Sequence, residues 1–217
     1  LLIGNREVAE VIADRRVHAV TLTGSEGAGR AVGEAAGRAL KKAVLELGGA
    51  DAFIVLEDAD LELTAAQAVV SRFQNAGQSC IAAKRFLVVE AVADEFLARF
   101  RAAVEALRPG DPADPQSTLA PLARHDLRDE LHRQVTRSIS AGAVAVTGCE
   151  PVSGPGAYYA ASILDGVRPG MPAYEEELFG PVASVIRIAD AEEGLAVANG
   201  SRFGLGGSIW TRDAQRG

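Results

Sequence analysis

Apolar residues recur along the chain in two alternating patterns. Short apolar runs rich in β-branched residues and bounded by glycines predict strands, and longer stretches with apolar residues at helical spacing predict helices. The strand patterns cover residues 17–25, 43–49, 52–58, 85–90, 143–148, 182–188 and 206–211. The helical patterns cover residues 7–16, 26–42, 61–75, 93–107, 124–142 and 191–200. Because strands and helices alternate throughout, the sequence predicts an α/β fold with a mostly parallel sheet.

Composition narrows the possible partners. The 217 residues are 48% hydrophobic and 24% charged, as in a globular chain that buries a sizeable core. The net charge of −7 and the lack of a basic stripe argue against a nucleic-acid partner. The apolar runs are shorter than a membrane span, so we expect no membrane partner. Two cysteines do not make a disulfide framework, which favours a reducing, cytoplasmic compartment.

The segment TGSEGAG at residues 23–29 lies between a predicted strand and a predicted helix. Backbone N–H groups at a helix N-terminus bind phosphate, and small residues allow the phosphate to approach closely. The glycine spacing is neither that of a Rossmann fingerprint nor that of a P-loop. Because a strand-to-helix turn also uses glycine for packing, this segment by itself leaves both interpretations open.

The segment ELGG places the carboxylate of Glu46 near the end of an apolar strand. Ligands of open α/β sheets bind at the carboxyl ends of strands, and a carboxylate in apolar surroundings can act as a general base. The alternative is a carboxylate that points to solvent or pairs with Lys41 or Lys42. The pattern alone does not choose between these interpretations.

The segment GQSC at residues 77–80 follows a predicted helix and ends on Cys80. A partly exposed thiolate held by backbone donors is a nucleophile. A free cysteine is, however, more often a small buried apolar residue. The second cysteine, Cys149, follows a predicted strand, and we expect it to be structural.

The segment EEELFGP at residues 175–181 sets three acids beside a tight turn. They could form a solvated acidic face, or one carboxylate could accept hydrogen bonds from a ribose diol. The histidines His18, His125 and His132 share no motif, and together with two cysteines they give no metal-ligand spacing. We therefore predict no metal site.

Taken together and in this order, the motifs resemble the aldehyde dehydrogenase superfamily. The similar segments are LTGSEGAG, LELGG, GQSC, EELFGPV and ANGSRFGLGGSIWT, which together span nearly the whole chain. Glu46 and Cys80 are 34 residues apart and Cys80 and Glu177 are 97 apart, close to the spacings usual in that family. The stretches FQNAGQSCIAAKRF and DLRDELHRQV are most similar to the succinate-semialdehyde dehydrogenase branch.

The resemblance implies a nucleophile, Cys80, and a general base, Glu46. It also implies six residues that contact an NAD or NADP cofactor. These are Gly24 and Ser25 at the pyrophosphate, Leu47 and Gly48 at the nicotinamide, and Glu177 with Phe179 at the nicotinamide ribose.

The resemblance further implies the end of a Rossmann-like cofactor domain over residues 1–48 and an α/β catalytic domain over residues 49–217. The implied reaction is NAD(P)-dependent oxidation of a small-molecule aldehyde, such as succinate semialdehyde, to the acid through a cysteine thiohemiacetal and a thioester. In the family, an oxyanion-binding Asn and a cofactor-binding Lys precede the matched region, and a tail that completes the subunit interface follows it. We therefore expect a fragment with weak activity, taken from a homo-oligomer (a dimer or tetramer).

The sequence leaves two alternative functions open, and two of its residues differ from the family pattern. The chain could be a catalytically incompetent fragment that acts only as a structural or assembly module. It could instead resemble CoA-acylating relatives, although Glu46 argues against that because this branch often lacks the base. Gln74 stands where succinate-semialdehyde enzymes often carry an arginine for the substrate carboxylate, which argues against succinate semialdehyde unless Arg72 or Arg85 substitutes. Glu26 stands where many members carry threonine, and its charge would disfavour a nearby 2′-phosphate.

Overall fold

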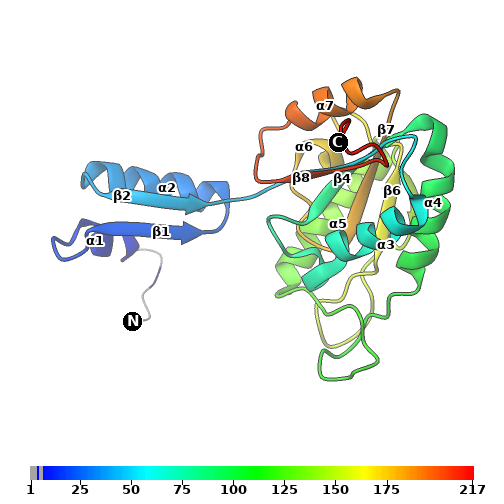
Figure 1. Ribbon diagram of the computed structural model, residues 1–217. Coiled ribbons are helices and arrows are strands. Elements are labelled where there is room, and N and C mark those ends of the chain that lie inside the picture. The colour runs from blue at the N-terminus through cyan, green and yellow to red at the C-terminus, as the bar shows by residue number, and fades with distance from the viewer. Residues whose placement is uncertain (1–3, 5–6) are drawn as a thin grey trace. The chain divides into compact units, whose positions relative to one another are not determined.

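The computed structural model describes residue 4 and residues 7–217 of the chain (Figure 1). The chain forms two compact units, Leu1–Gly48 and Gly49–Gly217. Each unit has its own hydrophobic core. None of the helices in the described part of the chain is long and apolar enough to cross a membrane.

The first unit is a β-α-β arrangement preceded by a short helix. Its elements are α1 (Val8–Ala13), β1 (Ala19–Thr23), α2 (Glu26–Arg38) and β2 (Lys42–Glu46). The two strands pair in parallel with Thr23 opposite Glu46, so their carboxyl ends lie side by side. The core is small and consists of Ile12, Val32 and Ala36, with apolar side chains of both strands packed against it.

The second unit is built on a six-stranded sheet in the order β5-β6-β7-β4-β3-β8, in which only the β5–β6 pair is antiparallel. Its strands are β3 (Asp51–Val55), β4 (Ala83–Val89), β5 (Val144–Thr147), β6 (Ser162–Asp165), β7 (Val182–Ile188) and β8 (Gly207–Trp210). Its helices are α3 (Leu61–Phe73), the 3₁₀ turn η1 (Gln74–Gly77), α4 (Glu90–Glu105), α5 (His125–Ser140), α6 (Pro172–Glu175) and α7 (Ala191–Asn199).

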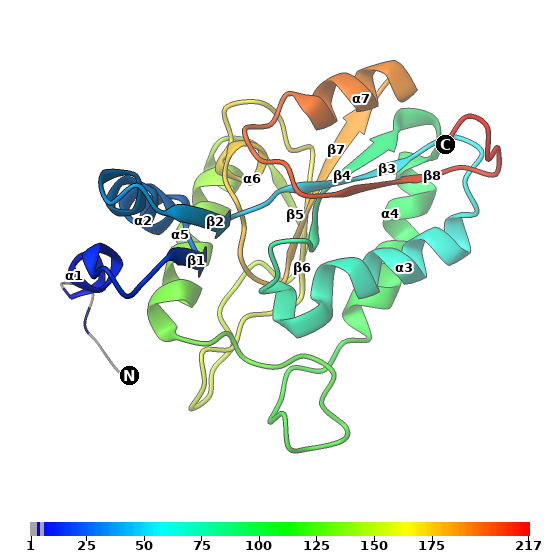
Figure 2. The same cartoon turned by 60° about the vertical axis from the view of Figure 1, so that its left-hand side comes forward.

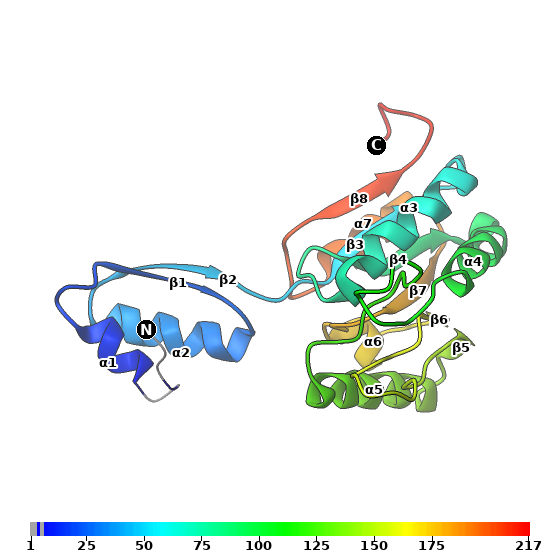
Figure 3. The ribbon, with the colours of Figure 1, turned by 90° about the horizontal axis from the view of Figure 1, so that it is seen from below.

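Helices cover both faces of this sheet (Figures 2 and 3). Side chains alternate along β3, so Phe53 and Val55 pack with α3 and α4, whereas Ile54 packs in the core under α5, α6 and α7. The neighbouring interior strands β3 and β4 are buried along their full length. Burial on both faces explains why the apolar parts of these strands, residues 52–55 and 86–89, are continuous runs in the sequence rather than alternating ones.

The predicted α/β class and mostly parallel sheet are confirmed. Every predicted helix and strand is present, with ends displaced by no more than four residues. The helix predicted over residues 61–75 ends at Phe73, because Asn75 and Ala76 adopt left-handed conformations. The sequence pattern missed β6 and α6, which have four residues each and lie in a stretch that glycine and proline interrupt repeatedly.

Candidate active site

A left-handed turn follows α3 and leads to Cys80. Asn75, Ala76 and Gly77 all have positive φ, at 53°, 53° and 72°. The side chains of Asn75 and Gln78 each donate to the other residue's backbone carbonyl, at 2.9 and 3.2 Å. Left-handed backbone costs roughly 1–2 kcal/mol for each non-glycine residue, so these bonds hold a conformation that the chain would otherwise avoid.

Gly77 is required in this turn for a second reason. A β-carbon at Gly77 would lie 2.2 Å from the carbonyl oxygen of Gly180, so no side chain fits there. The turn is therefore pressed against the segment that follows Glu177. The Gln78 side chain also ties the turn to the segment before α5, because its Oε1 accepts a hydrogen bond from the Ala123 N–H at 2.9 Å.

Cys80 is partly exposed, and its thiol is free. It lies three residues before β4 begins at Ala83. Gly49 precedes β3 and Glu177 precedes β7, the two strands that flank β4 in the sheet. The three residues thus gather at the amino ends of neighbouring parallel strands, not at the carboxyl ends where ligands of open α/β sheets usually bind.

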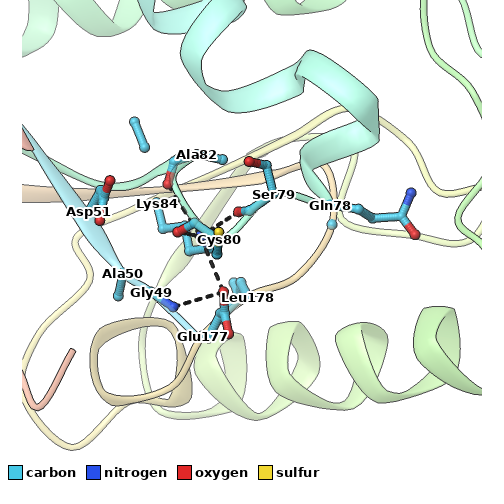
Figure 4. Close-up of polar contacts among 12 residues, drawn as sticks. Gly49, Ala50, Asp51, Gln78, Ser79, Cys80, Ala82, Lys84, Glu177 and Leu178 are labelled. Carbon is cyan, nitrogen blue, oxygen red and sulfur yellow. Dashed lines mark hydrogen bonds and ion pairs between the residues drawn. The ribbon is translucent and has the colours of Figure 1, made fainter. Parts of the chain in front are cut away.

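Lys84 connects Cys80 to Glu177, and the sequence motifs did not single it out (Figure 4). Its side chain is only 3% exposed, and Nζ lies 3.3 Å from Glu177 Oε1. Nζ also donates to the carbonyls of Ser79, Cys80 and Ala82, at 2.9, 3.0 and 3.3 Å. Burial lowers the pKa of the Lys84 ammonium group, and the charge of Arg72 lowers it further, whereas Glu177 opposes both effects.

Glu177 is held from the backbone as well as from Lys84. Its Oε1 accepts a hydrogen bond from the Gly49 N–H at 3.1 Å, and its own carbonyl accepts one from Gln134 Nε2 at 3.3 Å. The Glu177 side chain keeps 19% of its surface exposed, so the carboxylate can still meet a ligand. Phe179, the predicted neighbour of the cofactor ribose, has an exposed side chain.

Arg72 and Arg85 do not serve a substrate carboxylate in this structure. Arg72 is fully buried and donates to the carbonyls of Ala83 and Leu178, at 3.2 and 2.8 Å, and to that of Gly180. Burial lowers the pKa of Arg72 to about 9, against the opposing charge of Glu177. Arg85 donates to three other backbone carbonyls, those of Ala50, Val197 and Ala198. Both arginines therefore hold the fold, and neither substitutes for the arginine that Gln74 replaces.

The remaining predicted residues meet at the carboxyl ends of β1 and β2 in the first unit. The Gly24 N–H donates to the Glu46 carbonyl at 2.9 Å, and Ser25 Oγ caps α2 by accepting from the Ala28 N–H at 3.3 Å. Leu47 packs on α2 so closely that a β-carbon at Gly29 would lie 2.5 Å from it.

Gly48 follows Leu47 as the last residue of this unit. The surroundings of Glu46 differ from the sequence prediction. Its side chain is exposed rather than surrounded by apolar groups. Lys41, one of its predicted pairing partners, instead donates to the carbonyls of Ile12 and Asp14.

Cys149 differs from Cys80 in its burial. It is buried, and its sulfur lies 3.4 Å from the Thr147 carbonyl oxygen. Burial raises the pKa of the Cys149 thiol to about 11. Among residues 4 and 7–217, no three His, Cys, Asp or Glu side chains gather as a metal site.

The histidines lie apart from one another in the structure. His132 contacts the Tyr159 hydroxyl at 3.2 Å, and His18 and His125 are exposed. Within residues 4 and 7–217, no histidine is a hydrogen-bond partner of the turn that carries Cys80.

The aldehyde dehydrogenase family model matches residues 1–217, the whole chain. The chain belongs to the aldehyde dehydrogenase family. It is 53% identical over 209 residues to the NAD(P)+ succinate semialdehyde dehydrogenase Sad of Escherichia coli, covering 96% of this chain and 45% of that protein. It is 48% identical over 213 residues to the NADP+ succinate-semialdehyde dehydrogenase 1 of Mycobacterium ulcerans, covering 98% and 46%.

Solved aldehyde dehydrogenases share the fold closely. The succinic semialdehyde dehydrogenase of Streptococcus pyogenes, crystallised with NADP+, superimposes with a TM-score of 0.96 at 40% identity, covering 99% of this chain and 47% of that one. The chain thus spans just under half the length of the relatives it matches. The similarity to the succinate-semialdehyde dehydrogenase branch predicted from the sequence is confirmed.

Proposed function

We propose that this chain carries the thiol of an enzyme that oxidises an aldehyde to a carboxylic acid with NAD(P)+. The observation that carries the proposal is the environment of Cys80. Its thiol is partly exposed, and the buried Lys84 donates hydrogen bonds to the backbone carbonyls of Ser79 and Cys80. Membership of the aldehyde dehydrogenase family supports the reaction class. Succinate semialdehyde is the proposed substrate, and its support is that the relatives named above act on it by name.

In the proposed reaction, the Cys80 thiolate attacks the aldehyde carbon and forms a thiohemiacetal oxyanion. The Cys80 backbone N–H is a donor that can stabilise this oxyanion. NAD(P)+, when bound, supplies the hydride acceptor. Loss of hydride from the former aldehyde carbon leaves an acyl thioester on Cys80. Covalent attachment thus replaces one difficult step with two easier ones.

Glu46 would act in the second half of the reaction. Its carboxylate takes a proton from water as the oxygen attacks the thioester carbonyl, and the C–S bond then breaks to release the acid and the Cys80 thiolate. The exposed position of Glu46 at the end of β2 leaves it accessible to water.

The residues of the first unit fit a dinucleotide. Gly24 and Ser25 are exposed at the start of a 13-residue helix, whose first N–H groups have no intrahelical acceptor. A β-carbon at Gly24 would meet no atom closer than 3.7 Å, so a phosphate has room to approach. In this proposal, Leu47 and Gly48 lie at the nicotinamide and Glu177 and Phe179 at its ribose. The assignment of residues 1–48 to a cofactor domain and 49–217 to a catalytic domain follows from it.

The test is a pair of cysteine substitutions in the complete protein. Cys80→Ser should abolish aldehyde-dependent NAD(P)H absorbance, whereas Cys149→Ser should retain it. Activity in Cys80→Ser would contradict the proposal. A parent protein that forms a stable oligomer by light scattering yet reduces no cofactor would instead favour the assembly-module alternative. Product analysis with and without CoA separates hydrolysis from CoA acylation.

A further inference from the structure

Lys84 is the extra residue of a β-bulge at the start of β4. The residues on either side of it, Ala83 and Arg85, pair with Asp51 and Ala52, which are consecutive on β3. One residue of β4 is therefore inserted between two successive pairs. Such bulges redirect a side chain and are common beside active sites.

The bulge changes the direction in which Lys84 points. Farther along β4, Phe86 and Val88 face the apolar layer under α3 and α4, and Leu87 faces the opposite layer. Regular alternation continued back from Phe86 would put Lys84 into that first apolar layer. The bulge instead turns the ammonium group toward the loop that carries Cys80, where it finds acceptors.

The acceptors around Lys84 Nζ come from two elements of the candidate active site. Lysine is almost never this buried unless its charge is paired, and its three N–H groups need acceptors. Here the carbonyls of Ser79, Cys80 and Ala82 supply one side and the Glu177 carboxylate supplies the other. A single buried cation thus joins the turn with the thiol to the predicted ribose contact.

Glu177 is left with one oxygen for a ligand. Among the described residues, the hydrogen bond from Gly49 and the ion pair with Lys84 both fall on Oε1. Oε2 remains for a donor such as a ribose hydroxyl. A carboxylate that is already oriented loses less conformational freedom when it binds, which favours affinity.

We propose that Lys84 is a positioning residue that fixes the Cys80 turn and the Glu177 carboxylate with one ammonium group. The inference rests on the proposed function, in which Cys80 is the nucleophile and Glu177 contacts the cofactor. It predicts that Lys84 acts on cofactor binding through Glu177, so that the effects of substituting the two residues are not independent.

A double-mutant cycle in the complete protein tests this dependence. Lys84→Met and Glu177→Gln should each weaken NADP+ binding about tenfold, the loss expected for one charged hydrogen bond. The double variant should bind no more than about twofold more weakly than either single variant. Lys84→Met should also lower kcat, because it releases the Ser79 and Cys80 carbonyls, whereas Lys84→Arg, which keeps the charge, should recover most of the NADP+ affinity.

Lys41→Met is the matched control, because Lys41 also donates to backbone carbonyls but lies at the amino end of β2, away from the proposed cofactor contacts at the carboxyl ends of β1 and β2. It should lower thermal stability without changing NADP+ affinity. A double variant that binds about a hundredfold more weakly than the parent would show independent effects and overturn the proposal. If Lys84→Met does not fold, Lys84→Gln takes its place in the cycle. Failure of both to fold while Lys41→Met folds would assign Lys84 to stability alone.

The proposed function and this inference fail in different ways. Activity that survives Cys80→Ser removes the proposed function. Independent effects in the cycle, in an enzyme that Cys80→Ser inactivates, remove only the role of Lys84.

Discussion

A β-carbon on Gly49 would lie 2.3 Å from the carbonyl oxygen of Cys80. The chain entering β3 and the turn that carries the thiol are therefore in direct backbone contact. The N–H of the same glycine donates to Glu177 Oε1 at 3.1 Å. Gly49 thus sets the spacing between the candidate nucleophile and the candidate ribose contact without a side chain of its own.

Gly49→Ala should displace the Cys80 turn. The new methyl group meets rigid backbone rather than a flexible side chain, so overpacking should cost about 1–3 kcal/mol of unfolding free energy. We expect a lower Tm and a lower kcat. Gly204→Ala is the control, because a β-carbon there meets no atom within 4 Å. Equal effects of the two variants on kcat would show that the close contact at Gly49 is unimportant.

Gly77→Ala should be more damaging than another glycine with a similar backbone. Gly166 has φ 64° and open space around a β-carbon, whereas Gly77 has φ 72° and lies against the Gly180 carbonyl. Gly166→Ala therefore reports the conformational cost alone, about 1 kcal/mol. Guanidinium unfolding should show a loss at least about twice as large for Gly77→Ala. Equal losses would mean that the turn shifts to accept a side chain.

Cys149 should make stability fall at alkaline pH. Burial raises the pKa of its thiol from 9.0 to about 11, so between these values the unfolded chain releases a proton that the folded protein keeps. The unfolded state then binds fewer protons, and stability decreases as pH rises through this range but not below it. Cys149→Ser should lack this component, worth about 2 kcal/mol near pH ~10.5, in guanidinium unfolding. Identical pH dependence of parent and variant would contradict the assignment.

Glu26→Thr should strengthen NADP+ binding. Glu26 lies in the first turn of α2, where a negative charge opposes a phosphate at the helix N-terminus. Glu26 also forms an i,i+4 ion pair with Arg30 at 3.7 Å. We expect about threefold tighter binding by calorimetry. Glu34→Thr is the matched control, because Glu34 forms the same i,i+4 pair, with Arg38, two turns farther along. Equal changes would exclude an effect specific to the helix start.

Long periodic segments made most of the fold predictable. The strand predicted over residues 182–188 is observed with those ends because β7 is mostly apolar and is buried at every position except Arg187. β6 was not predicted, because its four residues contain only two apolar side chains, Ile163 and Leu164, which are too few to show a period. The left-handed turn at Asn75 and Ala76 was also missed, since neither residue type demands positive φ.

The thiol and the acidic motif of the candidate site could be singled out from the sequence, but the lysine that joins them could not. In the sequence, Lys84-Arg85 reads as an ordinary charged pair before a strand. Its burial depends on a bulge that is set by pairing with β3, which no local pattern reveals. The sequence also left open whether Arg72 or Arg85 could bind a substrate carboxylate, and only the tertiary structure shows that both donate to backbone carbonyls instead.

Trapping the acyl intermediate tests the central claim most directly. Glu46→Gln in the complete protein should allow Cys80 to form the thioester but slow its hydrolysis. With succinate semialdehyde and NADP+, peptide mass spectrometry should then find the succinyl group on the peptide that contains Cys80, together with a burst of one NADPH per subunit. NADPH formation with no adduct on Cys80, or with the adduct on Cys149, would contradict the account.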